Sequence, residues 1–296
     1  SRGGKGKAST RLADDSDSIQ HFFTCNDHDS VLLVTGQGIA YSVKAFQIPL
    51  SSRTAKGAPL PQVLPISSEE KVSTVIPIDQ FNENEFLILL TSKGYIKKTP
   101  LNAFSKITQR GLIIISLGEG DTLDWARRCD ADAEILVATR DGFASRYSVS
   151  QLKATSRTSR GVKALKLRPE DKMADMDILA DDSAGKGSHA LVVSSKGYGK
   201  RISIDEFRNQ KRGGKGVIAI KFKEKAGGSR KAGGDKPDTL ACMVTCKPGD
   251  EVVLSTSRGT VIRQRVDDLS IQSRTATGVL IQRLAKDDVI TSVDVL

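Results

Sequence analysis

Short apolar runs alternate with glycine-containing turns along the whole chain, and helical periodicity is nearly absent. One unit recurs: an apolar run, a tight turn with glycine, and an alternating strand that carries basic residues. This pattern is typical of a β-hairpin. The incoming strand is almost wholly apolar, which predicts burial on both faces, whereas the outgoing strand alternates. The predicted hairpins are Val31–Lys44, Phe86–Thr99, Ile135–Ser148, Leu191–Ser203 and Val252–Arg265.

A second motif is interleaved with the hairpins. It is a basic loop rich in Ser, Thr or Gly that ends in glycine and precedes a short apolar strand. The final glycines of these loops are separated by 51, 54, 50, 55 and 62 residues. The six basic loops are Ser1–Gly6, Ser52–Gly57, Thr108–Gly111, Ser156–Gly161, Gln210–Gly216 and Ser273–Gly278.

The period near 50 residues, with about four strands in each repeat, predicts a propeller-like fold. One repeat is too small to bury its own apolar face, so neighbouring repeats must stack. We therefore expect one all-β domain over residues 1–296, with repeats that start near 1, 52, 108, 156, 210 and 273. Two separate β-barrels are disfavoured because the period continues through the middle of the chain. Six basic loops against five hairpins predict six blades, the first of them incomplete.

The composition is that of a folded chain with excess positive charge. The 296 residues include 45 Lys and Arg against 35 Asp and Glu, which gives a formal net charge of +10. No run approaches the ~18 apolar residues that a membrane span needs, so no membrane partner is expected. The polar, glycine-rich stretch at residues 223–237 interrupts the repeats and predicts a mobile surface loop.

The basic loops predict a surface for a polyanion. Equivalent loops of a propeller lie on one rim, so their cations are expected to form a curved band that suits a long duplex. Cations, hydroxyls and glycines that let the backbone approach are what phosphate groups require. Aromatic residues are 5% of the chain, which disfavours stacking on single strands. The predicted DNA-binding residues are Arg2, Gly3, Gly4, Lys5, Gly6, Arg53, Lys56, Arg110, Arg157, Arg160, Gln210, Lys211, Arg212, Gly213, Gly214, Lys215, Gly216 and Arg274.

Further cations fall in the outgoing hairpin strands, where we expect them to extend the band. They are Lys44, Lys97, Lys98, Arg146, Lys200, Arg201, Arg263 and Arg265. The alternative is that exposed Lys and Arg, with ordinary turn residues, need no ligand to explain them. All six loops occupy the same position in the repeat, which favours a band of cations over this alternative.

Signals for catalysis or metal binding are weak. The three histidines lie far apart, no phosphate-binding GxxxxGK[ST] motif occurs, and no catalytic residue or cofactor site is predicted. The four tyrosines, Tyr41, Tyr95, Tyr147 and Tyr198, fall in outgoing strands and are interpreted as packing residues. Sparse cysteine indicates a reducing compartment, and no metal site is expected because paired ligands are lacking. The cysteines interpreted as core residues are Cys25, Cys129, Cys242 and Cys246.

Two of the basic loops resemble a known motif. Gln210–Gly216 reads QKRGGKG and is similar to the QRRGGKG box, the GyrA box, of DNA gyrase A subunits; Ser1–Gly6 resembles the end of the same box. The repeats TSKGYIKKT and SRTATGV resemble the C-terminal domain of that type IIA topoisomerase family. Position favours the loop at Ser1 as the box, and sequence favours the loop at Gln210.

The resemblance implies a β-pinwheel, in which neighbouring blades exchange strands and duplex DNA wraps around a basic outer edge to enable negative supercoiling. The domain would be non-catalytic and without a cofactor, because ATP, Mg and the catalytic tyrosine belong to other parts of the enzyme. Its partners would be the rest of the gyrase A polypeptide together with gyrase B, in an A2B2 assembly. The compartment would be bacterial cytoplasm or a plant chloroplast or mitochondrion. A topoisomerase IV C-terminal domain, a protein-interaction propeller and a propeller enzyme are the alternatives.

Overall fold

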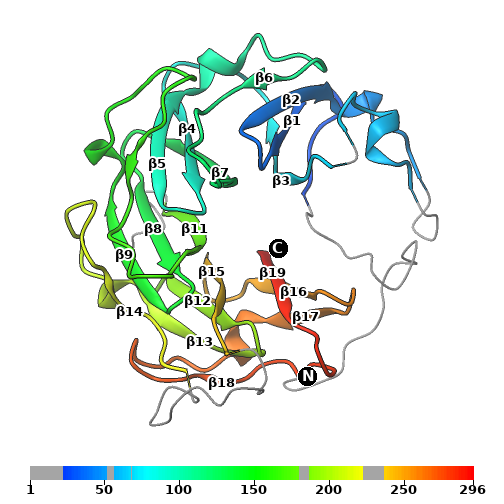
Figure 1. The fold of residues 1–296 in the computed structure, drawn as a ribbon. Coiled ribbons are helices and arrows are strands. Elements are labelled where there is room, and N and C mark those ends of the chain that lie inside the picture. Colours follow the sequence, from blue (N-terminus) through cyan, green and yellow to red (C-terminus); the bar gives the residue numbers. More distant parts are fainter. Residues whose placement is uncertain (1–22, 52–56, 68, 180–186, 223–236) are drawn as a thin grey trace.

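Five antiparallel sheets succeed one another in the computed structural model, which describes residues 23–51, 57–67, 69–179, 187–222 and 237–296. Figure 1 shows the sheets arranged around a common axis like blades, with the chain running from β1 round to β19. The all-β, propeller-like prediction is confirmed. The predicted mobile loop at residues 223–237 lies outside the described residues, except for Pro237.

The predicted hairpins form the centre of each sheet. Their turns need glycine: Gly197 has φ +84°, and a Cβ there would lie 2.3 Å from the carbonyl oxygen of Gln282. The hairpins are β1 (Ser30–Thr35) with β2 (Ile39–Lys44), β4 (Glu85–Thr91) with β5 (Tyr95–Pro100), β8 (Glu134–Thr139) with β9 (Phe143–Ser148), β12 (His189–Ser194) with β13 (Tyr198–Ser203), and β16 (Glu251–Thr256) with β17 (Val261–Arg265).

An inner strand pairs with the incoming strand of each hairpin and faces the axis (Figure 1). Residues from all five inner strands line a cavity of about 710 Å³ at the centre of the ring. The inner strands are β3 (Val72–Ile78), β7 (Leu123–Asp130), β11 (Met173–Leu179), β15 (Leu240–Cys246) and β19 (Ile290–Val295).

The outer strand of each four-stranded sheet comes from a later repeat. For example, Leu112–Ile113 (β6) follows the β4–β5 hairpin in sequence but pairs with β2 of the preceding blade. This exchange of strands is the pinwheel arrangement that the family resemblance implies. The other outer strands are β10 (Val162–Lys163), β14 (Val217–Ile218) and β18 (Val279–Leu280), which pair with β5, β9 and β13 respectively.

The expectation of six blades is wrong: the described residues form five. The count of basic loops overestimates the blades because each of the four loops from Thr108 onward leads into an outer strand that belongs to an earlier hairpin. The described residues after Gly57 form a 3-10 turn, Leu60–Gln62, instead of the predicted strand. A sheet needs a hairpin at its centre, and the described residues contain five. Four sheets have four strands, and the β17–β16–β19 sheet has three in the described part of the chain.

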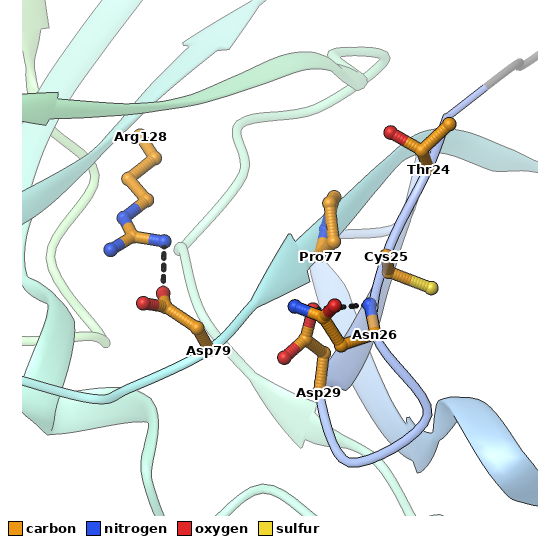
Figure 2. Close-up of a pocket in the computed structure, with 7 residues that line it drawn as sticks. All are labelled: Thr24, Cys25, Asn26, Asp29, Pro77, Asp79 and Arg128. Carbon is orange, nitrogen blue, oxygen red and sulfur yellow. Dashed lines mark hydrogen bonds and ion pairs between the residues drawn. The ribbon is translucent and has the colours of Figure 1, made fainter.

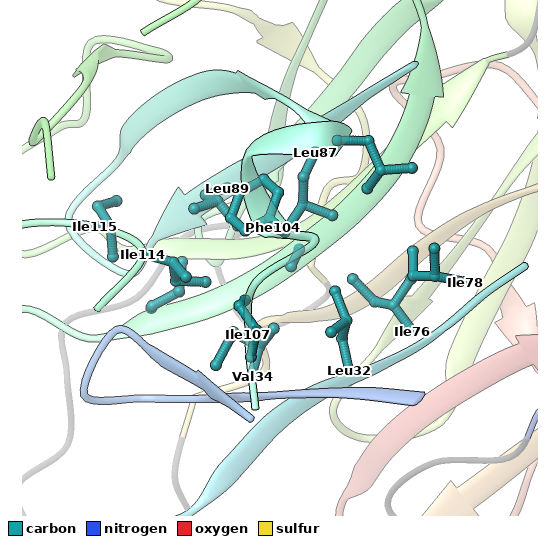
Figure 3. Close-up of a cluster of buried hydrophobic side chains, with 14 residues drawn as sticks. Leu32, Val34, Ile76, Ile78, Leu87, Leu89, Phe104, Ile107, Ile114 and Ile115 are labelled. Carbon is teal, nitrogen blue, oxygen red and sulfur yellow. The ribbon is translucent and has the colours of Figure 1, made fainter. Parts of the chain in front are cut away.

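The core lies in the seams between successive blades. In Figure 3, Leu32 and Val34 of β1 face Leu87 and Leu89 of β4, with Phe104 packed in the same cluster. The incoming strands are therefore buried on both faces, as their apolar runs predict. Because each seam buries apolar surface from two blades, the stability of one blade depends on its neighbours.

The described helices are single 3-10 turns, and most of them close a hairpin. None of the described helices has the length and apolar character that crossing a membrane requires. Those that bear on the site follow an outgoing strand: η1 (Ala45–Gln47), η3 (Leu101–Phe104), η4 (Val149–Gln151), η6 (Ile204–Glu206) and η8 (Val266–Asp268). A further turn, η2 (Leu60–Gln62), precedes β3.

Candidate nucleic-acid interface

The structure describes only part of the predicted DNA-binding set. It places the basic loops Thr108–Gly111, Ser156–Gly161, Gln210–Gly216 and Ser273–Gly278 directly before the outer strands β6, β10, β14 and β18. The loops therefore share one edge of the ring, the outer rim (Figure 1). The predicted residues outside the described ranges are Arg2, Gly3, Gly4, Lys5, Gly6, Arg53 and Lys56.

Each later basic loop is hydrogen-bonded to the outer segment of the blade before it. The backbone N–H of Lys166 donates to the carbonyl of Gly214 at 2.8 Å. The equivalent bonds run from Lys221 N–H to Ala276 at 3.3 Å and from Ser116 N–H to Ser159 at 3.3 Å. Consecutive loops are thus joined through the outer segments into a continuous rim.

The loop cations differ in exposure. Arg110, Arg160, Lys211 and Lys215 are exposed, whereas Arg157, Arg212 and Arg274 are half-buried. Of the half-buried side chains, those of Arg212 and Arg274 have structural contacts.

Arg212 and Arg274 hold their loops to the preceding outer strand. The Arg212 guanidinium donates to the carbonyl of Lys163 at 2.6 Å, and Arg274 donates to the carbonyl of Ile218 at 2.9 Å. Arg274 also lies 3.9 Å from the carboxylate of Glu206. That carboxylate offsets part of the charge that Arg274 would offer to an anion.

Two further guanidinium groups stack on aromatic rings beside the hairpin turns. Arg160 lies 4.2 Å from the ring centroid of Tyr95, and Arg168 lies 3.1 Å from that of Phe143. Stacking restrains the side chain while its N–H edge stays available to an acceptor. Arg168 is absent from the predicted set because it lies in the turn after the outer strand rather than in a basic loop.

The prediction that the outgoing-strand cations extend the exposed band is wrong for half of them. Lys97 is 2% exposed and Lys200 0%, and Lys98 and Arg201 are also buried. A basic loop of a later repeat covers Lys97 and Lys200, and the 3-10 turn of the following blade contacts Lys98 and Arg201. Alternation along a single strand cannot reveal either effect. Arg146 is half-buried, and Lys44, Arg263 and Arg265 are exposed.

The two buried lysines bind the backbone of the loops above them. The Lys200 ammonium donates to the carbonyls of Ser273, Arg274 and Ala276 at 2.6–2.7 Å. Lys97 makes the same contacts to the loop Ser156–Gly161. Burial lowers the pKa of both lysines to about 8. Both ammonium groups are therefore charged near neutral pH.

In each of these outgoing strands, the residue that follows the position of the buried lysine connects two blades. Arg146 donates to the carbonyls of Ile204 and Phe207, at the turn that closes the following hairpin. Arg201 donates to Leu269 in the same way at 2.9 Å. These cations are consequently part of the seams between blades.

Other exposed cations on the rim were missed by the sequence analysis. They flank the basic loops in repeated positions, which is a signal that aligning the repeats could have found. Those exposed before the loops are Lys106, Lys153 and Arg208, and those on or after the outer strands are Lys163, Lys166, Lys221 and Arg283.

The cysteines and tyrosines are mostly packing residues, as predicted. Cys129, Cys242 and Cys246 are buried, with burial raising the pKa of the Cys129 and Cys246 thiols to about 12. Among the tyrosines, Tyr41 and Tyr147 are buried, and Tyr95 and Tyr198 are half-buried.

Cys25 is exposed, so its interpretation as a core residue is wrong. It borders an open hollow of about 470 Å³ in which Arg128 pairs with Asp79 and Asn26 donates to Asp29, as Figure 2 shows. The polar groups of this hollow bind one another. In the described ranges, no three His, Cys, Asp or Glu side chains are grouped to hold a metal ion.

The chain matches the family model described as DNA gyrase C-terminal domain, beta-propeller. The match covers residues 1–26, 29–79, 85–130, 133–180, 188–227 and 250–296. The chain is 40% identical over 321 residues to the DNA gyrase A protein of Synechocystis sp., covering 99% of this chain and 36% of that protein. It is 35% identical over 306 residues to the chloroplastic/mitochondrial DNA gyrase A protein of Arabidopsis thaliana, covering 96% of this chain and 31% of that protein. The chain thus spans about a third of these relatives.

Solved structures agree on the fold. A DNA gyrase A C-terminal domain superposes with a TM-score of 0.82 at 23% identity, covering 100% of this chain and 91% of that one. The C-terminal domain of DNA topoisomerase IV superposes with a TM-score of 0.80 at 21% identity, covering 96% and 84%.

Proposed function

Because the chain belongs to the family of DNA gyrase C-terminal domains, we propose that it binds duplex DNA without sequence preference and wraps it around the basic rim. The observation that carries the proposal is the continuous rim of hydrogen-bonded basic loops, with exposed cations such as Arg160, Lys211 and Lys215. Charge along a curved edge neutralises successive phosphates and offsets the cost of bending the duplex.

The proposed contribution of this domain to a larger enzyme is to wrap DNA with one handedness. By presenting DNA with a fixed handedness, the domain would enable an ATP-dependent type II topoisomerase to introduce negative supercoils. It is proposed to be non-catalytic and without its own cofactor, with ATP and Mg bound by other parts of the enzyme. The proposed partners are the rest of the gyrase A polypeptide together with gyrase B, in an A2B2 assembly. Its relatives' names support bacterial cytoplasm or a plant organelle as the compartment.

A topoisomerase IV C-terminal domain, which would select DNA segments rather than wrap them, is the second candidate. The similarity to the fold of such a domain supports it. The box-like sequence at Gln210–Gly216 favours the gyrase role. A protein-interaction propeller remains the alternative from another class, and the aligned cations count against it.

The test is relaxation of plasmid DNA by topoisomerase I in the presence of the domain, beside a binding titration. Wrapping leaves a net linking-number change of one sign that grows with protein concentration. Binding without such a change would overturn the wrapping proposal. If about 8–10 cations contact phosphates, log K should fall with log salt at a slope of roughly −7 to −9. Binding that is insensitive to salt, or selective for one sequence, would contradict the proposed interface.

A further inference from the structure

We propose that the loop Ser156–Gly161 is a phosphodiester-binding site built from backbone amides, and that the buried ammonium of Lys97 positions those amides. The inference rests on the proposed function and deepens it. Exposed cations alone would attract a polyanion without fixing where a phosphate sits, whereas main-chain donors in a fixed array would define the position of one phosphate.

The Lys97 ammonium determines which way the loop's peptide groups point. It lies 2.8 Å from the carbonyl oxygen of Ser156, 2.6 Å from that of Arg157 and 3.2 Å from that of Ser159. All described peptide bonds are trans, and in a trans peptide the N–H points opposite to the C=O. The N–H groups of the residues that follow, Arg157, Thr158 and Arg160, are therefore directed away from Lys97.

These three N–H groups are available to a ligand. None of them makes a hydrogen bond to another described residue. Thr158 and Arg160 are exposed, and the Arg160 guanidinium is restrained over the ring of Tyr95. Adjacent backbone amides beside guanidinium and hydroxyl groups form a concave donor set that suits the oxygens of a phosphate.

The equivalent loops have lost at least one of these donors, and in Gln210–Gly216 the N–H of Gly213, which corresponds to Thr158, also donates to the carbonyl of Ala164 at 3.0 Å. The N–H of Arg274 donates to the Glu206 carboxylate at 3.0 Å, and the N–H of Arg212 donates to the Gln151 side chain at 2.8 Å. Glu206 and Gln151 are the third residues of η6 and η4, and the third residue of η3 is Ala103, which has no acceptor. Of these three loops, Ser156–Gly161 alone keeps all three amides free.

The lysine is also absent under the box-like loop. Ser145 occupies in β9 the place that Lys97 has in β5, and its buried hydroxyl has no hydrogen-bond partner among the described residues. The peptide groups of Gln210–Gly216 are therefore not oriented by an ammonium. This difference indicates that the two loops contact DNA differently, one through oriented amides and the other through exposed cations.

The test compares duplex DNA affinity at fixed salt for three single variants. Lys97→Met removes the positioning ammonium and should weaken binding about tenfold, because the loop loses its orientation. Ala103→Gln changes no charge but supplies the acceptor found at Gln151, and should weaken binding about threefold. Lys166→Met is the matched control, which removes one exposed charge and should weaken binding about two- to threefold by losing one phosphate contact.

Two further readouts separate positioning from general damage. In the wild type, the amide resonances of Arg157, Thr158 and Arg160 should shift on addition of duplex, and these shifts should be lost in Lys97→Met and diminished in Ala103→Gln. The double variant, Lys97→Met with Ala103→Gln, should lose less affinity than the product of the two single-variant losses predicts, since both substitutions act on the same amides.

The outcomes distinguish the two proposals. If the wild type does not bind duplex DNA, the proposed function fails. If the wild type binds, but Lys97→Met weakens binding no more than Lys166→Met and Ala103→Gln binds like the wild type, this inference is overturned while the proposed function stands. Should Lys97→Met not fold, Ala103→Gln and the amide shifts decide the question.

Discussion

The ammonium of Lys200 lies 2.6 Å from the carbonyl oxygen of Ser273, a residue 73 positions further along the chain. This contact joins the outgoing strand of one repeat to the basic loop of a later one. It lies beside the exchanged strand β18, which pairs with the same outgoing strand. A charged group inside the protein thereby fixes the shape of the surface proposed to bind DNA.

Replacing this lysine should destabilise the protein. Lys200→Met leaves the carbonyls of Ser273, Arg274 and Ala276 without their donor, and should lower the free energy of unfolding by about 2–4 kcal/mol. Lys166→Met, at an exposed position of the rim, should change it by less than about 0.5 kcal/mol. Urea denaturation measures both. Equal effects of the two substitutions would contradict the structural role of Lys200.

Asp175 makes stability depend on pH in an unusual direction. Its carboxylate accepts hydrogen bonds from the N–H groups of Met176 and Met243, and burial raises its pKa to about 7, with Arg127 opposing and Asp177 adding to the rise. Between pH 4 and 7 the folded state therefore binds more protons than the unfolded state. The stability from this group is present below pH 4 and is lost as the pH rises through 7.

The measurement is the difference in unfolding free energy between the wild type and Asp175→Asn across pH 4 to 8. This difference should fall by about 2–4 kcal/mol as the pH rises. Taking the difference removes the contribution of the other titrating groups. A difference that stays constant over this range would mean that Asp175 is ionised throughout.

Glycine at the end of a basic loop should matter where the outer strand packs closely. At Gly216, φ is +69° and a Cβ would lie 2.7 Å from the carbonyl oxygen of Ala144, so Gly216→Ala should cost about 2–4 kcal/mol. Gly249 has φ +90° but open space around it, and Gly249→Ala should cost about 1–2 kcal/mol. Thermal unfolding of Gly249→Ala measures the cost of backbone strain alone, and thermal unfolding of Gly216→Ala measures that strain plus the collision of the Cβ with the Ala144 carbonyl. An equal loss in both would show that the close approach is unimportant.

The box-like loops should contribute more to wrapping than to simple binding. Arg212→Ala with Lys215→Ala, and Arg2→Ala with Lys5→Ala, should reduce the handed linking change more than the affinity, because contacts that hold a bent duplex oppose its elastic recoil. Arg274→Ala should reduce wrapping less, and its pairing with Glu206 is consistent with a smaller role. Topoisomerase I relaxation and a retardation titration measure the two effects. Equal proportional losses of wrapping and of affinity would mean that the box-like loops act only as additional positive charge.

The sequence by itself determined the hairpins and the register of the basic loops. Both depend on local rules: a tight turn needs a residue such as Gly197 at positive φ, and a strand buried on both faces must be apolar, as Leu87–Leu90 is. The family resemblance of the box-like loop also needed no structure. These features involve residues close together along the chain, so a repeated pattern is sufficient to recognise them.

Only the tertiary structure decided which repeat completes which sheet. A two-residue strand such as Val217–Ile218 can pair with any open edge, and its partner β9 is chosen by how neighbouring blades pack. The equivalent pairings of β10 with β5 and of β18 with β13 bring the basic loops over Lys97 and Lys200 and bury them, while Arg160 stays exposed. All three look like surface cations in the sequence. The tertiary structure also shows five blades in the described part of the chain, because sheets are counted by their hairpins and not by the loops that supply their outer edges.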